Sequence, residues 1–133
     1  MAELPAKVLL DTNFLLIPIR FGVDIFSEAE RALNQLVEPT VSTGVLKEIE
    51  SLKKDAGPRF QRELSFARSL TSKCVVIEDE PREGETVDDS LVRLASSGDY
   101  IVATTDTELR KRLRSMGVKV LLLRQRRYLR LMG

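Results

Sequence analysis

The chain has 133 residues, of which 43% are hydrophobic, and its 21 basic and 20 acidic side chains leave a net charge of +1. This length is typical of a single domain, and this composition argues against a disordered chain. One cysteine and no histidine are present, which excludes an internal disulfide, cysteine-rich zinc sites, histidine-dependent catalytic triads and metal sites with histidine ligands.

The hydrophobic pattern predicts alternating strands and helices along the chain. In chain order, the first half comprises a strand over 6–10, helices over 14–19 and 25–36, a strand over 39–41, and helices over 43–52 and 58–70. The helices are recognised by apolar residues spaced three or four apart, such as Val45, Ile49 and Leu52. Ser42 or Thr43 is suited to cap the helix that contains this stripe.

The second half continues the alternation. It comprises a buried-type strand over 74–77, a polar loop over 78–85, a helix over 87–97, a strand over 100–103, a helix over 107–116 and a strand over 118–123. Apolar strands separated by helices predict a parallel sheet covered on both faces. We therefore predict one domain over residues 1–133, a three-layer α/β/α fold with an open five-stranded sheet, in which residues 124–133 form a basic C-terminal tail.

Charge is distributed unevenly. Residues 107–133 carry nine basic side chains and one acid, a net charge of +8, whereas the first 106 residues carry −7. Seven acids lie between Glu78 and Asp89, where Arg82 is the only basic residue. A basic segment beside an acidic body is typical of a site that binds a polyanion and concentrates cations, although solvated helix faces show the same pattern.

No apolar run reaches the roughly 18 residues that a membrane span requires. Residues 1–7 also lack the basic-then-apolar order of a signal peptide. From these features we expect a cytoplasmic protein that does not contact a membrane.

Two aspartates directly follow predicted strands. Asp11 comes after the strand over 6–10, and Asp106 lies just beyond the strand over 100–103. In open parallel sheets, functional residues gather at the carboxyl ends of the strands. An aspartate in such a place can also simply cap the next helix, so both interpretations stay open for each residue.

Two further acids are candidates for the same place. Asp88 opens the helix over 87–97, and its neighbour Asp89 points about 100° away around the helix. Glu48 lies within an apolar helix face, where it is either a solvated edge residue or a ligand. If the carboxylates converge, their mutual repulsion calls for a hard divalent cation such as Mg²⁺ or Mn²⁺. Sites of this kind commonly hydrolyse phosphodiesters.

Four motifs in this order resemble those of PIN domains, a family of ribonucleases. The first is 8–13 (VLLDTN), and the second is 46–49 (LKEI), in the helix after the second strand. The third is Asp88 with the helix that follows it, and the fourth is 101–106 (IVATTD). The spacing between Asp88 and Asp106 also fits the family and favours Asp88 over Asp89.

The resemblance implies a sheet of strand order 3-2-1-4-5 and a Mg²⁺- or Mn²⁺-dependent ribonuclease specific for single-stranded RNA. The implied catalytic and metal-binding residues are Asp11, Glu48, Asp88 and Asp106. It further implies that Asn13 orients Asp11, that Thr105 holds a carboxylate or phosphate, and that Glu108 stands where some relatives keep a fifth acid. Homodimers are frequent in the family.

The end of the chain, at 106–114, 117–118 and 127–128, resembles PIN nucleases of small-subunit rRNA processing, with VapC-type toxins as near relatives. The predicted partners are therefore single-stranded RNA and either a ribosome-assembly factor or an antitoxin. We expect the RNA backbone to contact a set of basic side chains: Arg110, Arg114, Arg124, Arg126 and Arg127. With two Tyr, five Phe and no Trp, extensive base stacking is not expected.

Other functions fit less well. A response-regulator receiver needs an acidic pair where Leu10 and Asp11 stand, and a lysine at the end of the last strand, where Arg124 follows Leu123. An aspartyl phosphatase would require an aspartate at position 13, which is Asn13. No glycine fingerprint of a dinucleotide site follows the first strand. A PIN fold that binds RNA or protein with little nuclease activity is the remaining alternative.

Overall fold

The computed structural model describes residues 4–133, and the observation on residues 1–7 lies partly outside this range. One six-stranded sheet runs through the molecule in the order β3-β2-β1-β4-β5-β6. Its strands are β1 (Ala6–Leu10), β2 (Val37–Ser42), β3 (Val75–Ile77), β4 (Ile101–Ala103), β5 (Val120–Arg124) and β6 (Tyr128–Met132). The first five are parallel, which confirms the order 3-2-1-4-5, and β6 is an added antiparallel strand.

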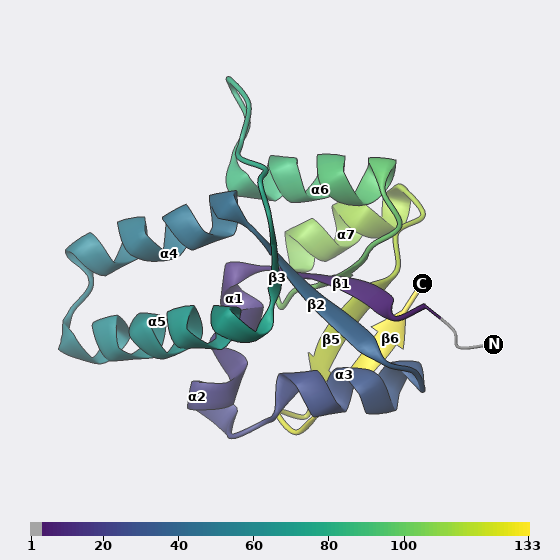
Figure 1. Cartoon of the computed structure of the whole chain (residues 1–133), viewed down its shortest axis with the longest axis horizontal. Helices are drawn as coiled ribbons and strands as arrows, with labels where there is room; N and C mark the ends of the chain where they lie inside the picture. Colours follow the sequence, from purple (N-terminus) through teal and green to yellow (C-terminus); the bar gives the residue numbers. More distant parts are fainter. Residues whose placement is uncertain (1–3) are drawn as a thin grey trace.

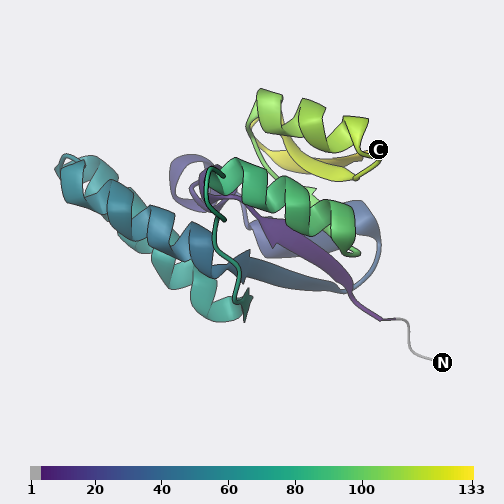
Figure 2. The same ribbon diagram turned by 90° about the horizontal axis from the view of Figure 1, so that it is seen from above.

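The helices cover both faces of the sheet and complete the predicted three layers. They are α1 (Thr12–Leu15), α2 (Ile17–Phe21), α3 (Ile25–Leu33), α4 (Thr43–Asp55), α5 (Pro58–Leu70), α6 (Val87–Ser97) and α7 (Thr107–Ser115), with a 3₁₀ turn over Thr71–Lys73. Helices α6 and α7 lie on one side of the sheet and α3 on the other (Figure 1). Helices α4 and α5 pack side by side and extend beyond the sheet (Figure 2). None of the helices in the described range is long and apolar enough to cross a membrane.

A strand forms within the range 74–77, but the prediction that it is buried is wrong. Val75 and Val76 of β3 are 45% and 48% exposed. Strand β3 pairs only with β2 and ends the sheet, so the helices that cover the central strands do not enclose it. By contrast, Val8, Leu9 and Leu10 of β1 are buried at the centre.

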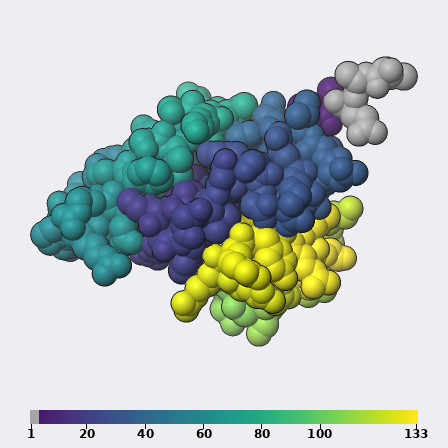
Figure 3. Space-filling view, turned by 90° about the horizontal axis from the view of Figure 1, so that it is seen from below, coloured from purple at the N-terminus to yellow at the C-terminus, as the bar shows by residue number. Residues whose placement is uncertain are grey.

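The predicted basic tail over 124–133 is also wrong. Strand β5 continues to Arg124, a turn follows, and β6 pairs back on β5 with Arg124 opposite Tyr128. Leu129 is buried, and its backbone N–H and C=O bond to Glu28 and Arg31 of α3. The C-terminal residues therefore pack against the segment that contains α2 and α3, as the yellow and the purple-to-blue surfaces show (Figure 3).

The register of the central strands places the candidate site. Leu10 of β1 lies opposite Ala103 of β4, and the backbone N–H of Asp11 donates to the carbonyl of Ala103 at 3.0 Å. The residues that follow these two strands, Asp11 and Thr104, are consequently neighbours at the carboxyl edge of the sheet.

Candidate functional site

Asp11 is the buried acid of this edge, with 3% of its surface exposed. One carboxylate oxygen accepts a hydrogen bond from the N–H of Thr12 at 2.8 Å, and the other accepts one from the Thr104 hydroxyl at 2.8 Å. Burial raises the pKa of the Asp11 carboxyl to about 6, the Thr104 hydrogen bond opposes this shift, and the charges of Asp88 and Glu48 add to it. Ionised Asp11 is therefore a group that a nearby cation would stabilise.

Thr104 connects the two strand ends. Its hydroxyl donates to Asp11 and accepts a hydrogen bond from the backbone N–H of Asp106 at 3.0 Å. Thr104 is 1% exposed, so this hydroxyl has no room to turn to solvent. Sequence reasoning missed Thr104, although its position directly after β4, beside the end of β1, identifies it once the register is known.

Glu48 projects from α4, whose first turn is capped by the Ser42 hydroxyl on the N–H of Val45. The Thr12 hydroxyl donates to a carboxylate oxygen of Glu48 at 2.5 Å. Thr12 therefore bonds to both acids, through its backbone N–H to Asp11 and through its hydroxyl to Glu48. Of the two alternatives left open for Glu48, an edge residue in solvent or a member of the site, this contact favours the second.

Asp88 and Asp89 have different environments although they are adjacent in α6. The pKa of Asp88 is raised by partial burial and by the negative charges of Asp106 and Glu48. Asp89 instead accepts from the N–H of Thr86 and forms an ion pair with Arg112 at 2.8 Å, and these bonds lower its pKa. The structure therefore directs Asp88 to the other acids and uses Asp89 as a helix cap.

Asp106 caps α7. One of its oxygens accepts hydrogen bonds from the N–H groups of Glu108 and Leu109 at 2.8 and 3.1 Å. Asp11 likewise accepts from the N–H of Thr12 at the start of α1. Each of these two aspartates therefore caps a helix and also lies at the edge where the candidate acids gather, so the two interpretations are not alternatives.

We refer to Asp11, Glu48, Asp88 and Asp106 as the acidic group. Within the described part of the chain, none of the four has a basic side chain within ion-pairing distance. Nor are any three acidic or cysteine side chains among residues 4–133 arranged to hold one metal ion by themselves. Mg²⁺ usually keeps several waters and binds one or two carboxylates together with substrate phosphates. The oxygen donors present fit such a hydrated site, not a closed protein cage.

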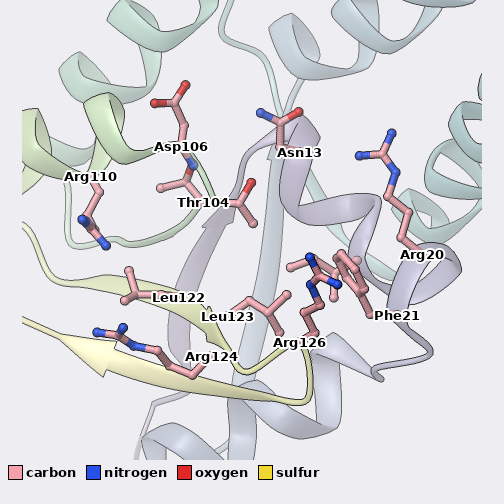
Figure 4. Close-up of a pocket in the computed structure, with 12 residues that line it drawn as sticks. Asn13, Arg20, Phe21, Thr104, Asp106, Arg110, Leu122, Leu123, Arg124 and Arg126 are labelled. Carbon is pink, nitrogen blue, oxygen red and sulfur yellow. The ribbon is translucent and has the colours of Figure 1, made fainter.

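A cavity of about 530 Å³ adjoins the acidic group, with Thr104, Thr105 and Asp106 in its wall. Arginines surround it: Arg20, Arg110, Arg124 and Arg126 (Figure 4). Three of these were predicted to contact RNA, whereas Arg20 was missed because it lies far before the basic segment over 107–133 in the sequence. The predicted Arg114 and Arg127 do not line the cavity, and Arg127 bonds to the side chain of Gln125.

A family model described as a PIN-like domain matches residues 8–126. The chain belongs to the PIN-like domain family. Ribonuclease VapC4 of Methanocaldococcus jannaschii is 28% identical over 129 residues, which cover 96% of this chain and 97% of that protein. The rRNA-processing protein FCF1 of Saccharomyces cerevisiae is 34% identical over 113 residues. That match covers 84% of this chain and 56% of FCF1, so this PIN-like domain spans about half the length of its rRNA-processing relative.

Solved structures resemble the fold as well. The PIN domain endonuclease Utp24 superposes with a TM-score of 0.78 at 26% identity, covering 96% of this chain and 91% of that structure. A domain of a functionally unknown protein from Methanocaldococcus jannaschii has a TM-score of 0.61 at 19% identity, which shows a shared fold alone. Family membership and the ribonuclease relatives thus support ribonuclease activity.

The supporting residues that the PIN resemblance suggested lie near the acidic group but differ in contacts. Asn13 lines the cavity and is exposed, and it makes no hydrogen bond to Asp11 in the described structure, where the Asp11 oxygens accept from Thr12 and Thr104 instead. Thr105 is also exposed in the cavity wall. Glu108 is exposed on the first turn of α7, and its backbone N–H bonds to Asp106.

Proposed function

We propose that this PIN-like domain is a divalent-metal-dependent endoribonuclease that hydrolyses phosphodiester bonds of single-stranded RNA. The observation that carries the proposal is the acidic group, which lacks a cationic partner in the described structure and adjoins an arginine-lined cavity. Uncompensated carboxylates attract a metal ion, and arginines attract phosphates. The two together are what metal-assisted cleavage of a polyanion requires.

Asp11, Glu48, Asp88 and Asp106 would hold Mg²⁺ or Mn²⁺, in combination with water and substrate phosphate. When bound, such an ion activates water and stabilises the charge that develops on the leaving oxygen. The Thr104 hydroxyl fixes the orientation of Asp11, and the Thr12 hydroxyl fixes that of Glu48. Arg110, Arg124 and Arg126 would contact the RNA beside these acids.

The relatives support a role in rRNA processing, because the rRNA-processing protein FCF1 has a higher identity to this chain than VapC4 has. A VapC-type toxin is the second candidate, since the chain aligns with nearly the whole length of VapC4. The corresponding partners are a ribosome-assembly factor or an antitoxin, with a homodimer as the expected assembly. Inducible expression separates the two roles: a toxin arrests growth of its host at once, whereas a processing enzyme does not.

Two adjacent residues provide the test of the chemistry. Asp88→Asn should abolish Mn²⁺-dependent cleavage of single-stranded RNA, because it removes a carboxylate that faces Asp106 and Glu48. Asp89→Asn should leave cleavage near the parental rate, since the asparagine oxygen can still accept from Thr86. Equal losses in both variants would contradict the assignment. A parent chain that binds RNA but cleaves none would indicate the non-enzymatic PIN module.

A further inference from the structure

The arginine-lined cavity has an apolar wall that contact with phosphates alone would not require. Ile17, Phe21, Leu122 and Leu123 form this wall (Figure 4). Ile17 and Leu122 are buried in the core, whereas Phe21 is 41% exposed. Phe21, ten residues after Asp11, is therefore an aromatic side chain of this wall that solvent reaches.

Arg126 lies over this ring, with its guanidinium carbon 5.7 Å from the ring centroid of Phe21. The turn that carries Arg126 is closed by a hydrogen bond from the N–H of Arg127 to the carbonyl of Arg124 at 3.0 Å. Gln125 and Arg126 both have positive φ, at 52° and 54°, a conformation that is unfavourable for residues other than glycine. Positive φ at both central residues is typical of the type I′ turns that join antiparallel strands such as β5 and β6, and the turn places a flat cation beside a flat ring.

Arg124 contributes a donor without a partner. Its Nε is buried and makes no hydrogen bond to any described residue, although buried polar groups are almost always bonded. Arg110, Arg124 and Arg126 also form no ion pair in the described structure, whereas Arg20 is paired with Glu63 at 3.1 Å. The cavity thus offers three arginines to an anion that comes from outside the chain.

We propose that this cavity is a subsite for one unpaired nucleotide of the RNA substrate, and this inference rests on the proposed function. Its base stacks with Phe21 and the Arg126 guanidinium, and its phosphate contacts Arg124 and Arg110. Stacking on aromatic rings and guanidinium planes is how unpaired bases are bound, and it accepts any base. The volume of about 530 Å³ lies in the range of small-ligand sites, which suits a single nucleotide.

The cavity lies beside the acidic group, and this position has a consequence for cleavage. Asp106 belongs both to the cavity wall and to the acidic group. A nucleotide bound in the cavity therefore lies next to the bond that is cut. The enzyme would then select single-stranded RNA because a paired base cannot enter beside the acids.

Binding measured without metal tests the subsite independently of cleavage. Fluorescence anisotropy in EDTA would compare single-stranded RNA oligomers with the same oligomers that carry one abasic ribose at successive positions. Phe21→Ala should weaken binding of intact RNA roughly 5- to 100-fold, the range expected for one stacked base. Phe21→Tyr keeps the ring and should bind like the parent. Phe66→Ala, an exposed phenylalanine of α5 outside the cavity, is the matched control and should also bind like the parent.

The abasic oligomers identify the cause of the loss. At one abasic position the parent should lose the same factor as Phe21→Ala does on intact RNA, and the variant should lose nothing more. A Phe21→Ala loss that persists at every abasic position overturns the subsite. So does duplex RNA that binds the parent as tightly as single-stranded RNA, or a change of oligomeric state in Phe21→Ala by sedimentation, which assigns the ring to a protein interface.

Cleavage is measured separately with Mn²⁺. If the parent cleaves RNA while its binding is insensitive to abasic positions, only the subsite is wrong. If the parent binds in the predicted base-dependent manner and cleaves nothing, the proposed nuclease function is wrong and the subsite stands.

Discussion

Two groups of acids in this molecule differ in how their charge is compensated. Asp79 and Glu85 surround Arg93, whose guanidinium bonds to Asp79 at 2.9 Å and to Glu85 at 3.0 Å. Arg93 lowers the pKa of Glu85. The acidic group of Asp11, Glu48, Asp88 and Asp106 has no such cation in the part of the chain that is described, and the pKa values of Asp11 and Asp88 are raised.

The comparison shows that acid density is a poor guide to function. The acid-rich segment between Glu78 and Asp89 is largely neutralised by distant basic residues. The ion pairs that do so are Asp79–Arg93, Glu85–Arg93, Glu80–Lys47 and Asp89–Arg112. Asp88 is the one acid of this segment that belongs to the acidic group. Acids paired within the chain hold the fold together, whereas unpaired acids create a demand for an external cation.

The largest expected effect is on the rate of RNA cleavage, which should depend on the acidic group and not on the acids that pair with Arg93. Asp11→Asn should reduce Mn²⁺-dependent cleavage of single-stranded RNA at least about 100-fold, because metal contributes several kcal/mol to such a transition state and each 1.4 kcal/mol is tenfold in rate. Asp79→Asn should cleave at the parental rate and unfold at lower denaturant, because it breaks the ion pair with Arg93. Initial rates and urea midpoints for both variants check this prediction.

The opposite results for the two variants would contradict the distinction between the acidic group and the acids that pair with Arg93. If Asp79→Asn loses activity while it remains folded, the Arg93 cluster contributes to the site. If Asp11→Asn retains the parental rate in a nuclease-free preparation, Asp11 does not bind the catalytic metal.

The second effect is the pH dependence of stability. The folded-state pKa of Asp11 is raised to about 6 from 3.8, so the folded protein binds more protons than the unfolded chain between these values. In EDTA, Asp11 should therefore reduce stability by about 2 kcal/mol as pH rises from 4 to 7. Asp11→Asn removes this loss. The free energy of unfolding of Asp11→Asn minus that of the parent should increase by that amount over the same range.

Asp89 provides a control of opposite sign. Its pKa is lowered in the folded state by Thr86 and Arg112, so its contribution is present near neutral pH and is lost as pH falls. Asp89→Asn minus parent should therefore decrease as pH rises. A flat difference for Asp11→Asn between pH 4 and 7 would mean that its carboxyl titrates normally.

Much of the fold could be predicted because the local pattern agrees with the tertiary structure. Residues 87–97 form α6 as predicted, since Thr86 and Asp89 complete a capping box before an apolar stripe. Strand β6 was missed because arginines at 126, 127 and 130 suggest a solvated tail, and the burial of Leu129 depends on α3. Only tertiary structure creates that contact.

The site was predictable to a similar degree. Asp11 and Asp106 follow strands, Asp88 begins a helix and Glu48 interrupts an apolar helix face, so all four positions stand out in the sequence. Thr104 and Arg20 do not, because the hydroxyl is selected by the pairing of Leu10 with Ala103 and the arginine by the packing of α2 beside β5. Residues that orient other side chains are selected by strand register and helix packing, which the amino-acid composition does not reveal.

The third effect is stabilisation by metal. At about 100 times its dissociation constant, Mn²⁺ should add about 2.7 kcal/mol to the parent, which for a domain of this size is a rise in Tm of roughly 10 °C. Asp106→Asn should be at least as stable as the parent in EDTA, because it removes one repelling charge and asparagine is also a good helix cap. It should lose most of the gain from Mn²⁺.

Asp24 is the matched control for this substitution. It caps α3 through hydrogen bonds to the N–H groups of Phe26 and Ser27, as Asp106 caps α7, but it lies outside the acidic group. Asp24→Asn should keep the full shift with Mn²⁺ in melting curves. A full shift in Asp106→Asn as well would exclude Asp106 from the metal site.

The smallest expected effect concerns the hydroxyl that orients Asp11. Thr104→Val deletes the donor to Asp11 and the acceptor for the N–H of Asp106, and positioning groups of this kind are worth about 10- to 100-fold in activity. Because the Thr104 hydrogen bond holds the pKa of Asp11 down, its loss should also move the acidic limb of the pH–rate profile to higher pH. Thr104→Ser should restore both the rate and the profile. If Thr104→Val lowers the rate at every pH by the same factor, the hydroxyl supports the packing of the two strand ends and does not tune the charge of Asp11.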